Sequence, residues 1–141
     1  MKKGFYTVLF LTGIAGLMSC HKESDPIPNV PVNIYVNTSD PNFVNLNAVG
    51  GWVYITGGNR GIIVYRKSQT EFMAIERTCA YKPSESNARV EVDTSTNIFL
   101  QDPSCGSKFL ITDGSLQNGP ATGPLRHYNT AFDGVTIHIY N

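Results

Sequence analysis

Short runs in which apolar and polar residues alternate, each bounded by Gly, Pro, Asn or Asp, constrain the fold of this chain most. Two of these runs, 32–37 and 135–140, carry an apolar residue at every second position. A period of two is typical of a strand with one buried face, whereas no segment of helical length has apolar residues at a period of 3.6. The sequence therefore predicts an all-β domain of small antiparallel sheets, arranged as a sandwich or a barrel.

Further strands are predicted where β-branched and aromatic residues gather between turn residues. The glycine-rich segment 57–61 predicts a tight turn, which would pair the strands on either side of it as a hairpin. Segment 42–49 predicts one turn of helix at most. The additional strands are expected at 52–56, 62–66, 71–77, 89–92, 97–100 and 107–111.

The N-terminal segment resembles an export signal. Lys2 and Lys3 precede a mostly apolar run that is too short for a comfortable transmembrane helix, and Leu-Met-Ser-Cys follows at 17–20. This ending resembles the lipobox of bacterial lipoproteins, which implies that Cys20 becomes the lipid-carrying N-terminus of the mature protein. An uncleaved anchor and an ordinary secretory signal that happens to precede a cysteine are the alternatives.

Three parts of the chain are expected: a signal peptide over 1–19, a lipid-anchored tether over 20–31 and a β domain over 32–141. Charges and three prolines indicate that the tether is extended. The lipobox implies a location in the cell envelope, periplasmic or surface-exposed, with the membrane as partner through Cys20 and an envelope protein as a further partner. Eleven basic and eleven acidic residues balance, so the sequence predicts no binding to nucleic acid.

Three short loops in the second half of the chain carry a shared pattern. They read Cys-Ala-Tyr at 79–81, Asp-Pro-Ser-Cys-Gly-Ser-Lys-Phe at 102–109 and Asn-Gly-Pro-Ala at 118–121. This pattern resembles the Rieske [2Fe-2S] domain family, whose loops read Cys-x-His and Cys-x-x-His-Gly-Ser-x-Phe, followed by Gly-Pro-Ala. The resemblance covers about 32–141 and implies a Rieske-like fold in which two former cluster-binding loops are apposed.

The side chains at the ligand positions depart from that family. Cys79 fills the first cysteine position, but Tyr81 replaces the first histidine, Asp102 the second cysteine and Cys105 the second histidine. Rieske clusters bind through two cysteines and two histidines, so the resemblance implies that no cofactor is bound; a [2Fe-2S] cluster with unusual ligands is the alternative. A single zinc or iron ion is not expected, because tyrosine is a poor zinc ligand and the other three residues would leave the site open. The histidines lie outside the motif, at His21, His127 and His138.

Lipidation of Cys20 leaves Cys79 and Cys105 as an even pair in an oxidising compartment, where a disulfide is expected. The resemblance brings their loops together and implies that this disulfide ties one to the other. Closing a loop on the order of 25 residues would stabilise the domain by about 3 kcal/mol. The separate loop disulfide of many family members would fall at Ser84 and Ser104, so it is missing here. A reversible thiol–disulfide sensor is a further alternative, although the chain has no Cys-x-x-Cys motif.

No catalytic residues are predicted. The chain contains no Gly-x-Ser-x-Gly, His-Glu-x-x-His or phosphate-loop motif. The sequence therefore predicts a non-catalytic structural or binding module of the cell envelope, and at most an electron-transfer component if a cluster is bound. Several acidic residues near the predicted strands indicate a solvated strand face rather than a catalytic pair: Glu71, Glu76, Glu91 and Asp93.

We predict that Cys20→Ser leaves the protein without lipid, because the Cys20 thiol is the group to which the lipid would be attached. Metabolic labelling with a fatty acid, followed by detection on the purified protein, measures the effect. Ser19→Ala keeps the cysteine and a small residue before it, so this control should be labelled like the wild type. Equal label in the wild type and Cys20→Ser would contradict the lipoprotein interpretation.

Overall fold

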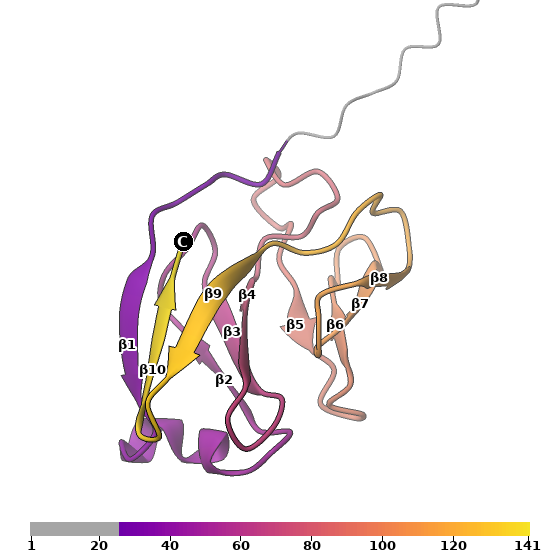
Figure 1. Ribbon diagram of the computed structural model, residues 1–141. Helices are drawn as coiled ribbons and strands as arrows, with labels where there is room; N and C mark the ends of the chain where they lie inside the picture. Colours follow the sequence, from indigo (N-terminus) through magenta and orange to yellow (C-terminus); the bar gives the residue numbers. More distant parts are fainter. Residues whose placement is uncertain (1–25) are drawn as a thin grey trace, which may run out of the picture.

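Two antiparallel sheets make up the computed structural model, which describes residues 26–141 (Figure 1). Six strands form one sheet in the order β1-β10-β9-β4-β3-β2, and four form the other in the order β5-β6-β7-β8. The predicted all-β class is confirmed. The elements are β1 Asn33–Asn37, η1 Pro41–Asn47, β2 Trp52–Ile55, β3 Ile62–Arg66, β4 Phe72–Glu76, β5 Glu91–Val92, β6 Phe99–Gln101, β7 Lys108–Leu110, β8 Leu116–Asn118, β9 His127–Phe132 and β10 Thr136–Tyr140.

The predicted signal peptide, the lipidation site Cys20 and His21 lie outside the described residues. Within residues 26–141, no helix is long and apolar enough to cross a membrane.

The described part of the predicted tether contacts the domain. Arg126, just before β9, donates to the side chain of Asn29 (2.6 Å) and to the carbonyl oxygen of Ile27 (2.8 Å). The side chain of Asn141 donates to the carbonyl oxygen of Val30 (3.0 Å), so this segment is fastened beside the C-terminus.

Most predicted strands are present, with ends that differ by one or two residues. β2 and β3 form the predicted hairpin, in which Val53 pairs with Val64. Two strands, β8 and β9, escape the sequence prediction because neither has a regular apolar alternation. β8 has only three residues, two of them exposed. β9 carries polar residues such as Asn129 on its surface and pairs through its backbone with β4 on one side and β10 on the other.

The element η1, Pro41–Asn47, consists of two short 3-10 helices that meet at a kink at Phe43 (φ −116°, ψ 18°), whereas the sequence predicts one turn of helix at most. Its N-terminus is capped by Asp40, whose side chain accepts a hydrogen bond from the N–H of Asn42. Pro41 occupies its first turn, where a missing N–H costs nothing. Leu46 is fully buried in the same core as Val53. Helices of this type repeat every three residues, so a search for a period of 3.6 does not detect them.

Strands β3 and β4 form a wall between two hydrophobic cores. On β3, Ile62 and Val64 belong to the core of the six-stranded sheet, whereas Ile63 belongs to a second core. That second core also contains Ile75 of β4 and Phe109 of β7, so the four-stranded sheet packs on the opposite face of the wall (Figure 1). Because both faces of β3 are covered, its sequence is a continuous apolar run rather than an alternating one.

The carboxylate of Glu76 corrects the prediction that this residue lies on a solvated strand face. Glu76 is fully buried at the end of β4. Its oxygens accept hydrogen bonds from the N–H groups of Asn59 (2.7 Å), Arg60 (3.0 Å) and Thr78 (2.9 Å), and from the hydroxyls of Thr78 (2.8 Å) and Tyr128 (2.7 Å). Burial raises the pKa of Glu76, but these hydrogen bonds outweigh it and hold the pKa below its ordinary value. The side chain is therefore a buried, charged anchor.

We predict that Glu76→Gln destabilises the domain by about 2–4 kcal/mol near neutral pH, because the amide turns an N–H₂ group toward hydrogen-bond donors. Folding lowers the pKa of Glu76 below its ordinary value of 4.5, so the carboxylate stabilises the fold above that pH and less as the pH falls through the folded pKa. The difference in unfolding free energy between wild type and variant should therefore shrink below about pH 4.5. Urea titrations at several pH values measure it.

Glu71→Gln is the matched control, since Glu71 lies just before the same strand and is exposed. This variant should change the unfolding free energy little at any pH. A Glu76→Gln effect that stays the same down to about pH 3 would contradict the anchoring role of the charge.

Candidate functional site

The first loop, residues 79–88, leaves the end of β4 and returns toward β5. The two ends of this loop are joined by a hydrogen bond from the N–H of Cys79 to the carbonyl oxygen of Ala88 (3.1 Å). Cys79 is fully buried, and its sulfur accepts a hydrogen bond from the N–H of Tyr81 (3.4 Å). The Cys79 thiol is therefore fixed at the base of the loop.

Arg60, in the turn between β2 and β3, holds the outer part of the first loop. Its guanidinium donates to the carbonyl oxygens of Ser86 (2.7 Å), Glu85 (2.6 Å) and Pro83 (3.2 Å). The backbone N–H of Arg60 donates to the carboxylate of Glu76. The turn between β2 and β3 therefore contacts both the buried carboxylate and the first loop. This role of Arg60 could not be predicted from the sequence, because its partners are backbone atoms 23 to 26 residues further along the chain.

The second loop, between β6 and β7, is shaped by Asp102. One carboxylate oxygen accepts hydrogen bonds from the N–H groups of Ser104 (2.8 Å) and Cys105 (3.4 Å), which is the pattern of an Asx turn. Gly106 follows in the left-handed region (φ +78°), and its N–H donates to the carbonyl oxygen of Asp102 (2.8 Å). Asp102 is only 1% exposed. Asp102 therefore folds the second loop through a buried carboxylate.

The third loop is fastened to Ser107. The Ser107 hydroxyl lies 3.2 Å from the sulfur of Cys105 and accepts a hydrogen bond from the N–H of Ala121 (3.2 Å). Gly119 approaches so closely that a Cβ at this position would lie 2.9 Å from the nitrogen of Ser107. Only glycine fits there, which explains the Gly in the Gly-Pro-Ala sequence.

The two loops bring three of the four predicted site residues together. The sulfurs of Cys79 and Cys105 lie 3.8 Å apart, and both residues are present as thiols. One carboxylate oxygen of Asp102 completes a group whose three atoms all lie within 4.8 Å of one another. Burial, and then the neighbouring carboxylate of Asp102, raise the pKa of the Cys79 thiol. The second oxygen of Asp102, Oδ2, is buried without a hydrogen-bond partner.

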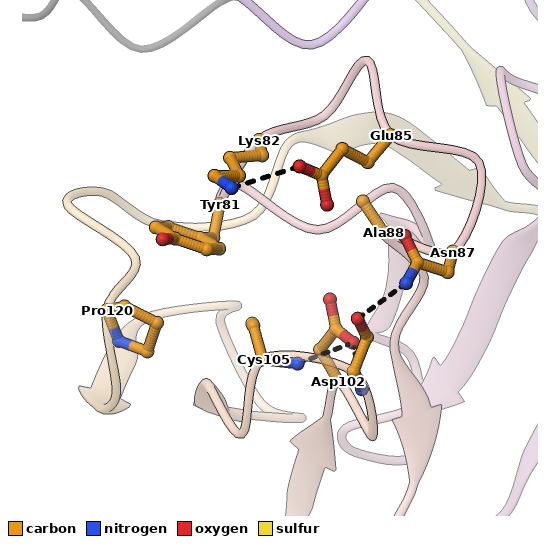
Figure 2. Close-up of a pocket in the computed structure, with 9 residues that line it drawn as sticks. Tyr81, Lys82, Glu85, Asn87, Ala88, Asp102, Cys105 and Pro120 are labelled. Atoms are coloured by element: carbon orange, nitrogen blue, oxygen red, sulfur yellow. Dashed lines mark hydrogen bonds and ion pairs between the residues drawn. The ribbon is translucent and has the colours of Figure 1, made fainter.

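A cavity of about 290 Å³ opens beside this group. Figure 2 shows Tyr81, the fourth predicted residue, across the cavity from Cys105 and Asp102. Its ring lies 5.5 Å from the ammonium group of Lys82. Asn87 of the first loop and Ser104 of the second loop also line the cavity, and the side-chain N–H of Asn87 donates to the hydroxyl of Ser104 (2.7 Å). This hydrogen bond joins the first loop to the second at Ser104.

The described histidines do not join the group. His127 is exposed at the start of β9. The ring of His138, on β10, is stacked between Tyr35 (4.3 Å between ring centroids) and Tyr140 (4.7 Å), and its Nε2 lies 2.7 Å from the side chain of Asn33. Among residues 26–141, the group of possible metal ligands contains no imidazole.

No protein-family model matches this chain, and no curated protein is significantly similar to it in sequence. Solved structures do match it. The cyanobacterial plasma membrane Rieske protein PetC3 from Synechocystis PCC 6803 is similar with a TM-score of 0.57 and 22% identity, over 77% of this chain and 99% of that chain. The domain has a Rieske-like fold. The ferredoxin of carbazole 1,9a-dioxygenase from Nocardioides aromaticivorans IC177 has a TM-score of 0.48 and 19% identity, over 79% of this chain and 98% of that one.

The predicted Rieske-like fold is thus confirmed, but a shared fold does not fix the chemistry of the site. A Rieske cluster requires two thiolates and two imidazoles. The described group offers two thiols and one carboxylate, and Tyr81 adds only a phenol across the cavity. These hard oxygen donors do not match the ligand set of a [2Fe-2S] cluster.

We predict that Arg60→Ala loosens the first loop, because three carbonyl oxygens lose their donors while the strands keep their pairing. Amide hydrogen exchange resolved by segment should be faster by about tenfold or more in 82–88, and unchanged in β3 and β4. Arg126→Ala is the control, since this arginine holds the segment before β1 instead. Unchanged exchange in 82–88 would contradict the role of Arg60.

Proposed function

We propose that this protein is a lipid-anchored component of the cell envelope whose Rieske-like domain has lost its [2Fe-2S] cluster and serves a structural or binding role. The donor set carries the proposal. Asp102 stands at a cysteine position, where it folds the loop, and Cys105 stands at a histidine position beside Cys79. The glycines of the loops are kept, whereas Asp102 replaces one of the two thiolates, and Tyr81 and Cys105 replace both imidazoles.

In the oxidising envelope, Cys79 and Cys105 form a disulfide that ties the two loops. Their sulfurs are 3.8 Å apart, so a local shift of less than about 2 Å would bring them to bonding distance. Arg60 and the hydrogen bond between Asn87 and Ser104 hold the loops at other points, which confines that shift to the two cysteines. The tie would replace the stabilisation that a cluster gives to the family's loops.

Membrane attachment through Cys20 agrees with the nature of the matched structure, which is named as a plasma membrane protein. The open cavity beside Tyr81, Asn87 and Pro120 is the surface through which this domain would bind a ligand or an envelope partner. Its polar walls favour a polar partner rather than a lipid chain.

We predict that the full-length protein, purified without air, is colourless and contains neither iron nor acid-labile sulfide near cluster stoichiometry, because two of the four required ligands are oxygen donors. Absorption spectra with iron and sulfide assays measure this. The triple variant Tyr81→His/Asp102→Cys/Cys105→His recreates the family's ligand set and is the positive control for cluster assembly. The single variant Tyr81→His should stay colourless, since two ligand positions remain unlike the family's. A wild-type protein with about two irons and two sulfides would contradict the proposal.

Thiol counting under denaturing, non-reducing conditions measures whether Cys79 and Cys105 are oxidised in protein taken directly from the envelope. No free thiol at either position is expected. Two free thiols would refute the disulfide without restoring the cluster, since iron and sulfide are measured separately.

A further inference from the structure

The arrangement of Cys79, Cys105 and Asp102 has the dimensions of a site for one metal ion. Two thiolates bound to a tetrahedral zinc ion at about 2.3 Å each lie about 3.8 Å apart. The sulfurs of Cys79 and Cys105 are 3.8 Å apart, with a carboxylate oxygen of Asp102 within 4.8 Å of both. Two irons bridged by sulfide would need two further thiolate or imidazole ligands, whereas a single ion needs no more than these three atoms and a water.

The carboxylate of Asp102 supplies a second, independent observation. Its Oδ1 is used by the N–H groups of Ser104 and Cys105, while Oδ2 is buried and has no hydrogen-bond partner. A buried carboxylate oxygen without a partner is costly, and few such atoms persist in folded proteins. A cation held beside the two sulfurs would give this buried carboxylate a charged partner, and the Asx turn already fixes the orientation of the carboxylate.

Hydrogen bonds around the sulfurs are those that orient metal-bound thiolates. The N–H of Tyr81 points to the sulfur of Cys79 (3.4 Å), and the N–H of Ser107 points to the sulfur of Cys105 (3.5 Å). The hydroxyl of Ser107 lies 3.2 Å from the same sulfur and could donate to it once the thiol proton has gone. Such outer contacts hold ligands in place and stabilise the negative charge on sulfur.

We propose that the protein with reduced cysteines binds one zinc ion through Cys79, Cys105 and Asp102, with a water in the fourth position on the cavity side. Binding displaces the two thiol protons to solvent, and no electron is transferred. The proposal rests on the proposed function in that the site must be free of [2Fe-2S]. It replaces the expectation from the sequence that no single metal ion is bound, because Tyr81 is not needed as a ligand. Three protein ligands and an open position are typical of zinc sites that bind or activate a small polar molecule.

The test uses the full chain carrying Cys20→Ser, so that the third cysteine does not contribute, reduced with a phosphine under anaerobic conditions. Zinc is titrated against a chromophoric chelator, and Co²⁺ is added in parallel as a spectroscopic probe. We expect one zinc per chain, and Co²⁺ bands of a tetrahedral site with thiolate-to-cobalt charge transfer. Weak binding without thiolate-to-cobalt absorption would overturn the proposal.

Three variants separate this site from adventitious binding. Asp102→Asn keeps an oxygen for the Asx turn but loses the charged ligand, so zinc affinity should fall by at least about tenfold. Cys105→Ser should abolish the charge-transfer band, and Tyr81→Phe should leave both affinity and spectrum unchanged. Affinity retained in Asp102→Asn, or lost in Tyr81→Phe, would overturn the ligand set. Iron and sulfide assays on the same preparation distinguish a failure of the zinc proposal from a failure of the proposed function. Only iron and sulfide at cluster stoichiometry would contradict the proposed function.

Discussion

The buried carboxylate of Glu76 is the interaction on which the rest of the site depends. It joins the turn between β2 and β3 to the end of β4, and through Tyr128 it reaches β9. It also accepts two hydrogen bonds from Thr78, the residue before Cys79. Arg60, in the same turn, then holds the outer part of the first loop. A single charge at the end of a strand therefore sets the position of a thiol and of the loop that surrounds it.

The two loops belong to a Rieske-like fold, and the donor atoms that they bring together are two thiols and one carboxylate. Gly106 and Gly119 still provide the conformations and close approach that the loops need. Asp102 contributes both a turn and a buried carboxylate oxygen beside the sulfurs of Cys79 and Cys105. Two proposals, a disulfide in the oxidised protein and a zinc site in the reduced one, follow from the same pair of sulfurs. They exclude each other at any moment, because a sulfur in a disulfide is no longer a thiolate ligand.

Local pattern allowed much of the fold to be predicted, and long-range partners explain what was missed. The alternation in β1 and β10, and the glycines of the loops, lie within a few residues of sequence and indicated the fold correctly. Glu76 looked like an ordinary surface acid, because its partners Asn59 and Tyr128 are distant in the chain. The sequence identified the positions Cys79, Tyr81, Asp102 and Cys105, but which of them converge depends on loop geometry. The side chain of Tyr81 lies across the cavity from Asp102 and Cys105, and the spacing of these residues in the sequence does not predict that separation.

Diffraction at the iron absorption edge, from crystals of protein purified without air, tests the central claim most directly. The claim is that the apposed loops hold three donor atoms that do not bind a [2Fe-2S] cluster. The account predicts no anomalous iron peak between Cys79 and Asp102 in such crystals. Two iron peaks at this place, spanning Cys79, Tyr81, Asp102 and Cys105, would contradict it.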